Sequence, residues 1–387
     1  MNGAGVSERS SLTDLFNDFP AENMSRRSDA PSLVTWALRA RMKAVPSKSW
    51  NLETLSPACF GLVMATGIVS LAAHKLSLGI VPWLLFGFNL VFFLVLWALT
   101  IWRAVRHTKQ LFGDMANHSR APGFFTMVAG SNILGSQFVV LLHDYRWGGL
   151  LWGFGTGLWV VLTYAIFAAL TISAKKPQLA RVLSGGWLLA IVATQSVAVL
   201  AGLLAHHEGW LGASLMNFLA LSMWLWGGLL YIWIMGLIFF RYLFLRFKPA
   251  DLSPSYWINM GAMAISTLAG TQLIFNAPQS PLLAGILPFL KGLTLLYWAA
   301  GTWWIPLLLV LGFWRHIYMR YPIQYEPLHW GVVFPFGMYA ASTYGLLNVF
   351  GLEFLHWLPP LFLYAAMAAW ILAFSGLAHD IWLRATA

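Results

Sequence analysis

The sequence has few charged residues and only one cysteine, and both shortages narrow the class of protein. Of its 387 residues, 9% are charged and 59% are hydrophobic. So few polar side chains cannot cover the surface of a water-soluble globule. The single cysteine, Cys59, excludes an intrachain disulfide and a thiolate metal cluster. The composition therefore predicts an integral membrane protein.

Catalytic and nucleotide-binding motifs are also missing. The sequence has no HExxH zinc motif, no phosphate-binding loop and no histidine pair at haem-ligand spacing. Its net charge of +10 comes from basic residues that lie between apolar runs, whereas a nucleic-acid-binding protein carries them in a patch on a soluble domain. We expect no enzymatic activity, no cofactor, no metal and no nucleic acid partner. The alternative of a membrane enzyme or assembly scaffold has no catalytic motif to support it.

Ten apolar runs are long enough to cross a bilayer, which takes about 20 helical residues. We expect spans at Pro57–His74, Val81–Trp102, Pro122–Leu142, Gly148–Ile172, Gly185–Ala205, Leu211–Phe244, Tyr256–Asn276, Pro281–Phe313, Trp330–Phe350 and Leu355–Ala378. Residues 51–380 are then the membrane domain, residues 1–50 a mobile cytosolic tail, and residues 381–387 a short cytosolic tail. The stretch 33–38, followed by basic residues, is either a surface helix on anionic lipid or part of an ordinary positively charged tail.

The distribution of lysine and arginine predicts the orientation. Twenty of the 23 lie on one predicted side, in the two tails, in alternate segments between spans and, for Arg241, at the adjoining end of the sixth span. Two, Lys75 and Arg146, lie in the opposite loops, and Lys291 lies near the outer end of the eighth span. Because cytoplasmic segments are enriched in basic residues, both termini are predicted to be cytoplasmic, with the protein in the plasma (inner) membrane.

Odd-numbered and even-numbered spans differ in composition. The odd spans hold nineteen Ser, Thr, Asn or Gln residues and three tryptophans, and the even spans hold eleven and thirteen. Bulky aromatic side chains suit a lipid-facing surface, whereas polar groups in lipid are costly. We therefore expect five helical hairpins, with an inner ring of odd-numbered helices around a central pore and an outer ring of even-numbered helices.

No Asp or Glu falls within the predicted spans, which argues for transport of an anion or a neutral solute. Hydroxyl and amide groups of the odd spans can line a pore for anions, or they can simply join helices. The candidates are Thr66, Ser70, Thr126, Ser131, Asn132, Thr194, Gln195, Ser266, Thr267, Ser342 and Thr343. In the ninth span, Pro335 predicts a bend, at which Phe334 either projects into the pore or packs in the core.

The segments Ser56-Pro57-Ala58-Cys59-Phe60-Gly61 and Phe334-Pro335-Phe336-Gly337-Met338-Tyr339 resemble the tellurite-resistance/dicarboxylate transporter family. That family includes malate and sulfite transporters and plant slow anion channels. The resemblance extends over roughly residues 51–380 and implies a homotrimer whose protomers each contain a pore. It also implies that Phe334 gates this pore and that Phe60, Gly61 and Pro335 lie beside it.

Two functions follow from this resemblance. The first is a gated pathway for small anions, either C4-dicarboxylates such as malate or inorganic anions. The alternative is a proton-coupled exporter of dicarboxylate, sulfite or tellurite. The missing intramembrane carboxylates favour the first, and the Phe-Pro-x-Gly-x-Tyr form of the ninth span favours the second.

Overall fold

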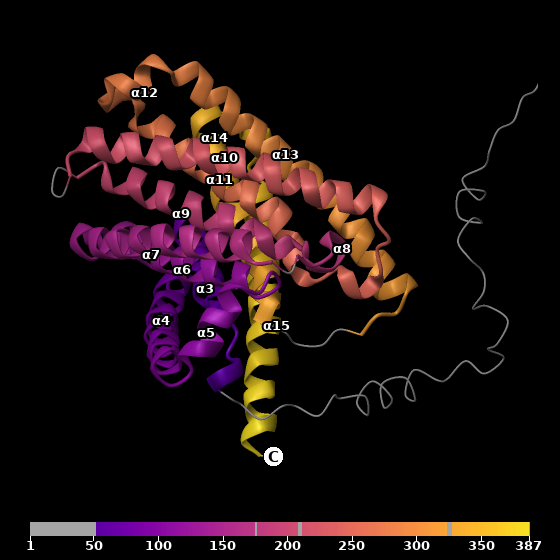
Figure 1. The fold of residues 1–387 in the computed structure, drawn as a ribbon. Coiled ribbons are helices and arrows are strands. Elements are labelled where there is room, and N and C mark those ends of the chain that lie inside the picture. Colours follow the sequence, from indigo (N-terminus) through magenta and orange to yellow (C-terminus); the bar gives the residue numbers. More distant parts are fainter. Residues whose placement is uncertain (1–51, 175, 208–210, 323–326, 387) are drawn as a thin grey trace, which may run out of the picture. The chain divides into compact units, whose positions relative to one another are not determined.

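The computed structural model describes residues 52–174, 176–207, 211–322 and 327–386. These residues form helices and contain no strand, so the predicted all-α class is confirmed for them (Figure 1). They belong to one unit, Ser49–Ala387. The predicted amino-terminal tail, with its apolar stretch 33–38, lies outside the described residues.

Within the described residues, nine helices are long and apolar enough to cross a membrane. They contain, in several cases with an adjoining 3-10 turn, α3 (Gly61–Lys75), α4 (Val81–Arg106), α6 (Phe125–Leu142), α7 (Tyr145–Ile172), α9 (Leu189–Leu204), α10 (Ala213–Phe244), α11 (Ile258–Asn276), α13 (Leu287–Phe313) and α15 (Leu358–Ala385). Each coincides with one predicted span. The short helices α5 (Thr108–Met115), α8 (Leu179–Val182) and α12 (Pro281–Gly285) lie between them.

The helix α14 (Trp330–Phe350) has the bounds predicted for the ninth span, but it is not one of these nine. Its proline, glycines, tyrosines and hydroxyl residues lower its mean hydropathy. With 21 residues at about 1.5 Å per residue, it is nevertheless long enough to cross a hydrocarbon core.

Some predicted bounds need correction, because they followed the apolar run and a helix can continue into water. The helix α15 ends at Ala385, so it includes most of the predicted tail 381–387. Similarly, α4 continues to Arg106, with two arginines in its last turn, where cations are favoured by the helix dipole. The predicted span Pro281–Phe313 divides into α12 and α13, and each begins with a proline in its first turn.

The long helices fall into two sets by burial. In the apolar segments of α3, α6, α9 and α11, 83–89% of the residues are buried, against 11–39% in α4, α7, α10, α13 and α15. Most residues of α14 are buried as well. We call α3, α6, α9, α11 and α14 the buried helices, and the other five the exposed helices. This division matches the predicted difference between odd and even spans.

The buried helices contact one another in chain order. The helix α3 packs against α6, α6 against α9, α9 against α11, and α11 against α14, which in turn packs against α3. Each exposed helix packs most extensively against the buried helix that precedes it, as α4 does against α3 and α15 against α14. Side chains that are far apart in the sequence are thereby brought close together in the fold.

A 3-10 turn precedes every buried helix. The turns are Pro57–Phe60, Ala121–Phe124, Gly185–Leu188, Pro254–Trp257 and Pro327–His329. Each of them begins with or contains a proline or a glycine pair. The first contacts the second, and the contacts continue in order until the fifth contacts the first. The starts of the buried helices therefore lie together at one end of the fold.

Near the ends of three exposed helices, an arginine donates a hydrogen bond to a backbone carbonyl that lies ahead of a buried helix. Arg103 donates to the carbonyl of Glu53, Arg241 to that of Leu183, and Arg315 to that of Leu252. Each of these carbonyls lies just before the 3-10 turn of the buried helix in the same pair. Arg103 and Arg241 are almost fully buried and also pair with Asp114 and Asp251.

Candidate functional site

Phe334 lies on the inner side of α14 and is fully buried. A Cβ atom added at Gly331 would lie 3.5 Å from Ile258 of α11, and one at Gly337 would lie 3.2 Å from Ile68 of α3. At about 100° per residue, three residues turn the helix by about 300°, so Gly331 and Gly337 point about 60° to either side of Phe334. Phe334 therefore points between α3 and α11.

Pro335 lies beside Phe334 and packs against α11. A Cβ added at Gly261 would lie 2.8 Å from Cγ of this proline, so α11 and α14 approach closely here. Inside a helix, proline removes one backbone hydrogen bond. The predicted neighbours Phe334 and Pro335 thus both lie where α14 meets other buried helices.

The opposite side of α14 is bonded to the exposed helix α13. Trp298 Nε1 donates to Thr343 Oγ1 over 3.0 Å, and the hydroxyls of Thr302 and Tyr339 are 2.8 Å apart. Thr343 follows Phe334 by nine residues, or about 180° around the helix axis. These bonds fix the rotation of α14 and so the direction of Phe334.

The contact between α3 and α14 repeats every seven residues. Gly61 faces Trp330, Ile68 faces Gly337, and Lys75 faces Tyr344. Two parallel helices keep such a spacing when they pack along a common line. We call these three pairs the α3–α14 seam. The predicted residue Gly61 is part of it, whereas the ring of Phe60 packs against Trp97 and Phe93 of α4.

Most predicted pore-lining polar residues are buried, and several bond exposed helices. Trp370 donates to Thr66 (2.9 Å), Trp159 donates to Thr194 (2.8 Å), and Ser70 donates to the carbonyl of Pro82 (2.8 Å). Gln195 donates to the carbonyl of Trp224 over 3.0 Å. Together with Thr343, these residues have the helix-joining role that the sequence left open.

The other predicted polar residues bond closer to the interior. Asn132 donates to Ser196 of α9 (3.2 Å), and Thr126 donates to the carbonyl of Pro57, ahead of α3 (3.0 Å). The hydroxyls of the remaining four donate to carbonyls of their own helix; these residues are Ser131, Ser266, Thr267 and Ser342. Their hydroxyl oxygens keep the capacity to accept a further bond.

A side-chain hydrogen bond joins each exposed helix to the next buried helix. The five bonds are Asn89 to Gln137, Trp159 to Thr194, Trp224 to the carbonyl of Ser266, Trp298 to Thr343, and Trp370 to Thr66. Four of the five donors are tryptophan indoles. The tryptophan content of the even spans predicts a lipid-facing surface and does not reveal this role, although an indole N–H in an apolar helix needs an acceptor.

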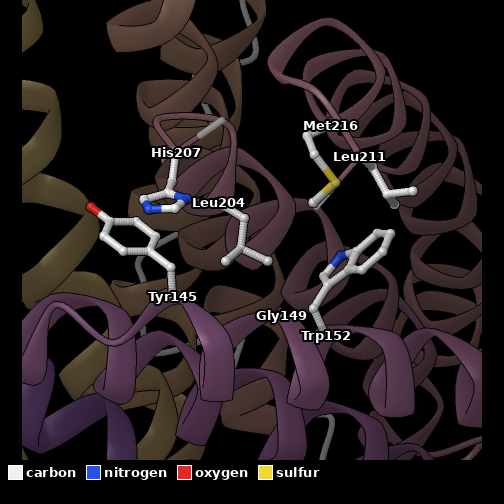
Figure 2. A pocket seen from close by; sticks show the side chains of 7 residues that line it. All are labelled: Tyr145, Gly149, Trp152, Leu204, His207, Leu211 and Met216. Atoms are coloured by element: carbon white, nitrogen blue, oxygen red, sulfur yellow. The ribbon is translucent and has the colours of Figure 1, made fainter. Parts of the chain in front are cut away.

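Two cavities lie at opposite ends of the buried helices. One of about 300 Å³ lies near the starts of α11 and α14, and its lining includes Arg315, His316 and His329. The other, of only about 20 Å³, lies between α7, α9 and α10, where Tyr145 stacks on His207 (Figure 2). The smaller cavity has room for about one water molecule.

A family model described as voltage-dependent anion channel matches residues 54–378. The chain belongs to this voltage-dependent anion channel family. The matched range includes all ten long helices except the last residues of α15. The predicted resemblance to the tellurite-resistance/dicarboxylate transporter family is thereby confirmed. Membership supports the predicted membrane location and anion transport.

This member of the family has relatives in a bacterium and in an archaeon. It is 34% identical over 154 residues to an uncharacterized membrane protein of Mycobacterium tuberculosis, over 39% of this chain and 77% of the relative. It is 22% and 21% identical to two uncharacterized transporters of Methanocaldococcus jannaschii, over 78% and 80% of this chain and 87% and 88% of theirs. The family and these names point to a transporter and not to an enzyme.

Proposed function

We propose that the five buried helices enclose a pathway through which small anions cross the membrane, and that Phe334 closes it. The observation that carries the proposal is the position of Phe334 between the α11-facing Gly331 and the α3-facing Gly337. A fully buried phenyl ring at this level excludes water and ions. Family membership supports an anion as the transported solute.

The pathway requires that α14, the predicted ninth span, cross the membrane together with the nine helices of higher mean hydropathy. The closed order of contacts among the buried helices supports an inner ring of five, and the pairing of each with an exposed helix supports five hairpins. Three arginines donate to carbonyls just ahead of 3-10 turns, whereas few lysines or arginines in the described part of the chain lie near the other end. Under the positive-inside rule, the turns are then cytoplasmic, as are both termini. The resemblance supports a homotrimer in the plasma membrane.

The proposed solutes are C4-dicarboxylates such as malate, or inorganic anions. The polar groups beside the pathway are uncharged hydroxyls and amides, such as Ser131 and Asn132. Such groups stabilise a partly dehydrated anion through weak hydrogen bonds, which permits both binding and release. The Phe-Pro-x-Gly-x-Tyr form of α14 supports the dicarboxylates.

The test compares Phe334→Ala with Phe336→Ala in planar bilayers under asymmetric salt. Phe336 packs against Trp257 and Phe362, away from the space that Phe334 faces, so it is a matched control on the same helix. We expect a large anion-selective conductance from Phe334→Ala and little from the wild type or the control. Equal conductance of the two variants would contradict a gate at Phe334.

A proton-coupled carrier is the second candidate, because two relatives are named transporters. It would export dicarboxylate, sulfite or tellurite. Liposomes that take up malate or sulfite only under a pH gradient, with no conductance in either phenylalanine variant, would favour this carrier over the gated pathway.

A further inference from the structure

Lys75 is the last residue of α3 and a half-buried cation without a carboxylate partner among the described residues. Its ammonium lies 5.9 Å from the ring centre of Tyr344. The buried arginines at the opposite end of the fold differ, because Arg103 and Arg241 pair with aspartates. An aromatic ring carries no net charge, so the positive charge of Lys75 is not compensated.

The α3–α14 seam gives the position of Lys75 relative to Phe334 along the helix axis. Tyr344 follows Phe334 by ten residues in α14, which corresponds to about 15 Å along the helix axis. Phe334 lies beside the same seam, next to Gly337. Lys75 therefore lies at the end of the buried helices away from the 3-10 turns, roughly 15 Å beyond the proposed gate.

A fixed charge at the mouth of a low-dielectric pathway raises the local concentration of ions of opposite sign. The effect is strongest at low ionic strength, because the Debye length is about 10 Å at 0.1 M salt and about 30 Å at 0.01 M. The polar groups beside the gate are uncharged, so an ammonium at the mouth would supply charge selectivity that they cannot.

We propose that Lys75 is a specificity-determining residue that attracts anions to the outer mouth of the pathway, with Tyr344 holding its ammonium in place. This inference rests on the proposed function, since it assigns an electrostatic role within the same pathway. Tyr344 supplies a contact that orients the lysine and leaves its charge available to the solute.

The first test uses channels opened by Phe334→Ala, with Lys75→Gln, Lys75→Arg or Lys291→Gln added. Lys291 is a half-buried lysine of α13 and serves as the matched control. We expect Lys75→Gln to lower anion conductance by about threefold in 0.01 M salt, with a smaller effect in 1 M salt. Lys75→Arg and Lys291→Gln should keep the conductance. Equal conductance of Lys75→Gln and Lys75→Arg at low salt would overturn the proposal.

The second test does not depend on conduction. An amine-reactive reagent that cannot cross the membrane is applied to wild-type proteoliposomes, and mass spectrometry measures acylation of Lys75 and Lys291. Sodium chloride should slow the reaction at Lys75 relative to a bulky sulfonate salt of equal ionic strength, and it should leave Lys291 unchanged. If chloride protects neither lysine, the proposal fails. If it protects Lys75 but Phe334→Ala carries no current, the gated pathway fails while the anion site at Lys75 stands.

Discussion

Trp298 of α13 and Thr343 of α14 are hydrogen-bonded across the side of α14 opposite Phe334. Thr343 lies about 180° around the helix axis from Phe334, yet its bond to Trp298 fixes the rotation of the helix that carries the phenyl ring. The hydrogen bond between the hydroxyls of Thr302 and Tyr339 also holds α14 in this rotation. The proposed gate therefore depends on side chains at the interface between a buried and an exposed helix.

Replacing Trp298 with phenylalanine should weaken this interface and loosen the gate. The change removes the indole donor and leaves the Thr343 hydroxyl without it, so we expect a loss of about 1 kcal/mol in the free energy of unfolding. A small anion leak should accompany it in planar bilayers. Trp303→Phe, at an exposed position of α13, is the control. If Trp298→Phe neither leaks anions nor loses stability, the bond does not position α14.

The close approach of α11 and α14 should make Gly261 sensitive to any side chain. A methyl group there would lie 2.8 Å from Pro335, so Gly261→Ala should destabilise the protein by about 1–3 kcal/mol. Gly292 of α13 has no atom within 4 Å of an added Cβ. Gly292→Ala should be neutral or stabilising by up to about 1 kcal/mol. Thermal unfolding in detergent compares the two, and similar melting temperatures would refute the packing argument.

The bond between Asn89 and Gln137 should show energetic coupling. Their side chains are buried and only 2.6 Å apart, between α4 and α6. Either single change to leucine should destabilise the protein, and the double variant should lose less than the sum, with a coupling energy of about 0.6–1.7 kcal/mol. Unfolding free energies of the four proteins give this coupling directly. Simple additivity would mean that the amides stabilise the fold independently.

The arginine at the end of α10 should be essential for stability. Arg241 donates to Leu183 and to the Tyr256 hydroxyl, and it pairs with Asp251, so Arg241→Gln leaves buried polar groups without partners. We expect a loss of about 3 kcal/mol or more. Arg246→Gln removes the same charge from an exposed position nearby and should cost little. Equal stability of the two variants would contradict this role.

Much of the architecture follows from composition alone. Apolar length predicted the positions of the spans, and the excess of hydroxyls and amides in odd spans predicted which helices are buried. The sequence could not specify where those polar groups point. Thr66 and Thr194 read equally well as pore-lining or helix-joining residues, because one residue step changes the direction of a side chain by about 100°. Their bonds to Trp370 and Trp159 depend on helix rotation, which hydropathy does not encode.

The two glycines beside Phe334 illustrate the same limit. Gly331 and Gly337 are visible in the sequence, but their meaning depends on Ile258 and Ile68, which belong to other helices. In the sequence, Lys75 is only one of two basic residues in the predicted outer loops. The position of its ammonium over the Tyr344 ring depends on α3 and α14 running parallel in this register. No local sequence pattern predicts that register.

The bond between Trp370 and Thr66 spans 304 positions of the chain. During synthesis, Thr66 enters the membrane long before its partner exists, and α3 lacks both α14 and α15 until the last helices are inserted. Contacts of such sequence separation form late, since the intervening chain must first be ordered. The first and last helices therefore complete this bond only after synthesis nears its end, so a chain truncated before Trp370 would leave Thr66 without its indole donor, although α3 would keep its packing against α6 and α14.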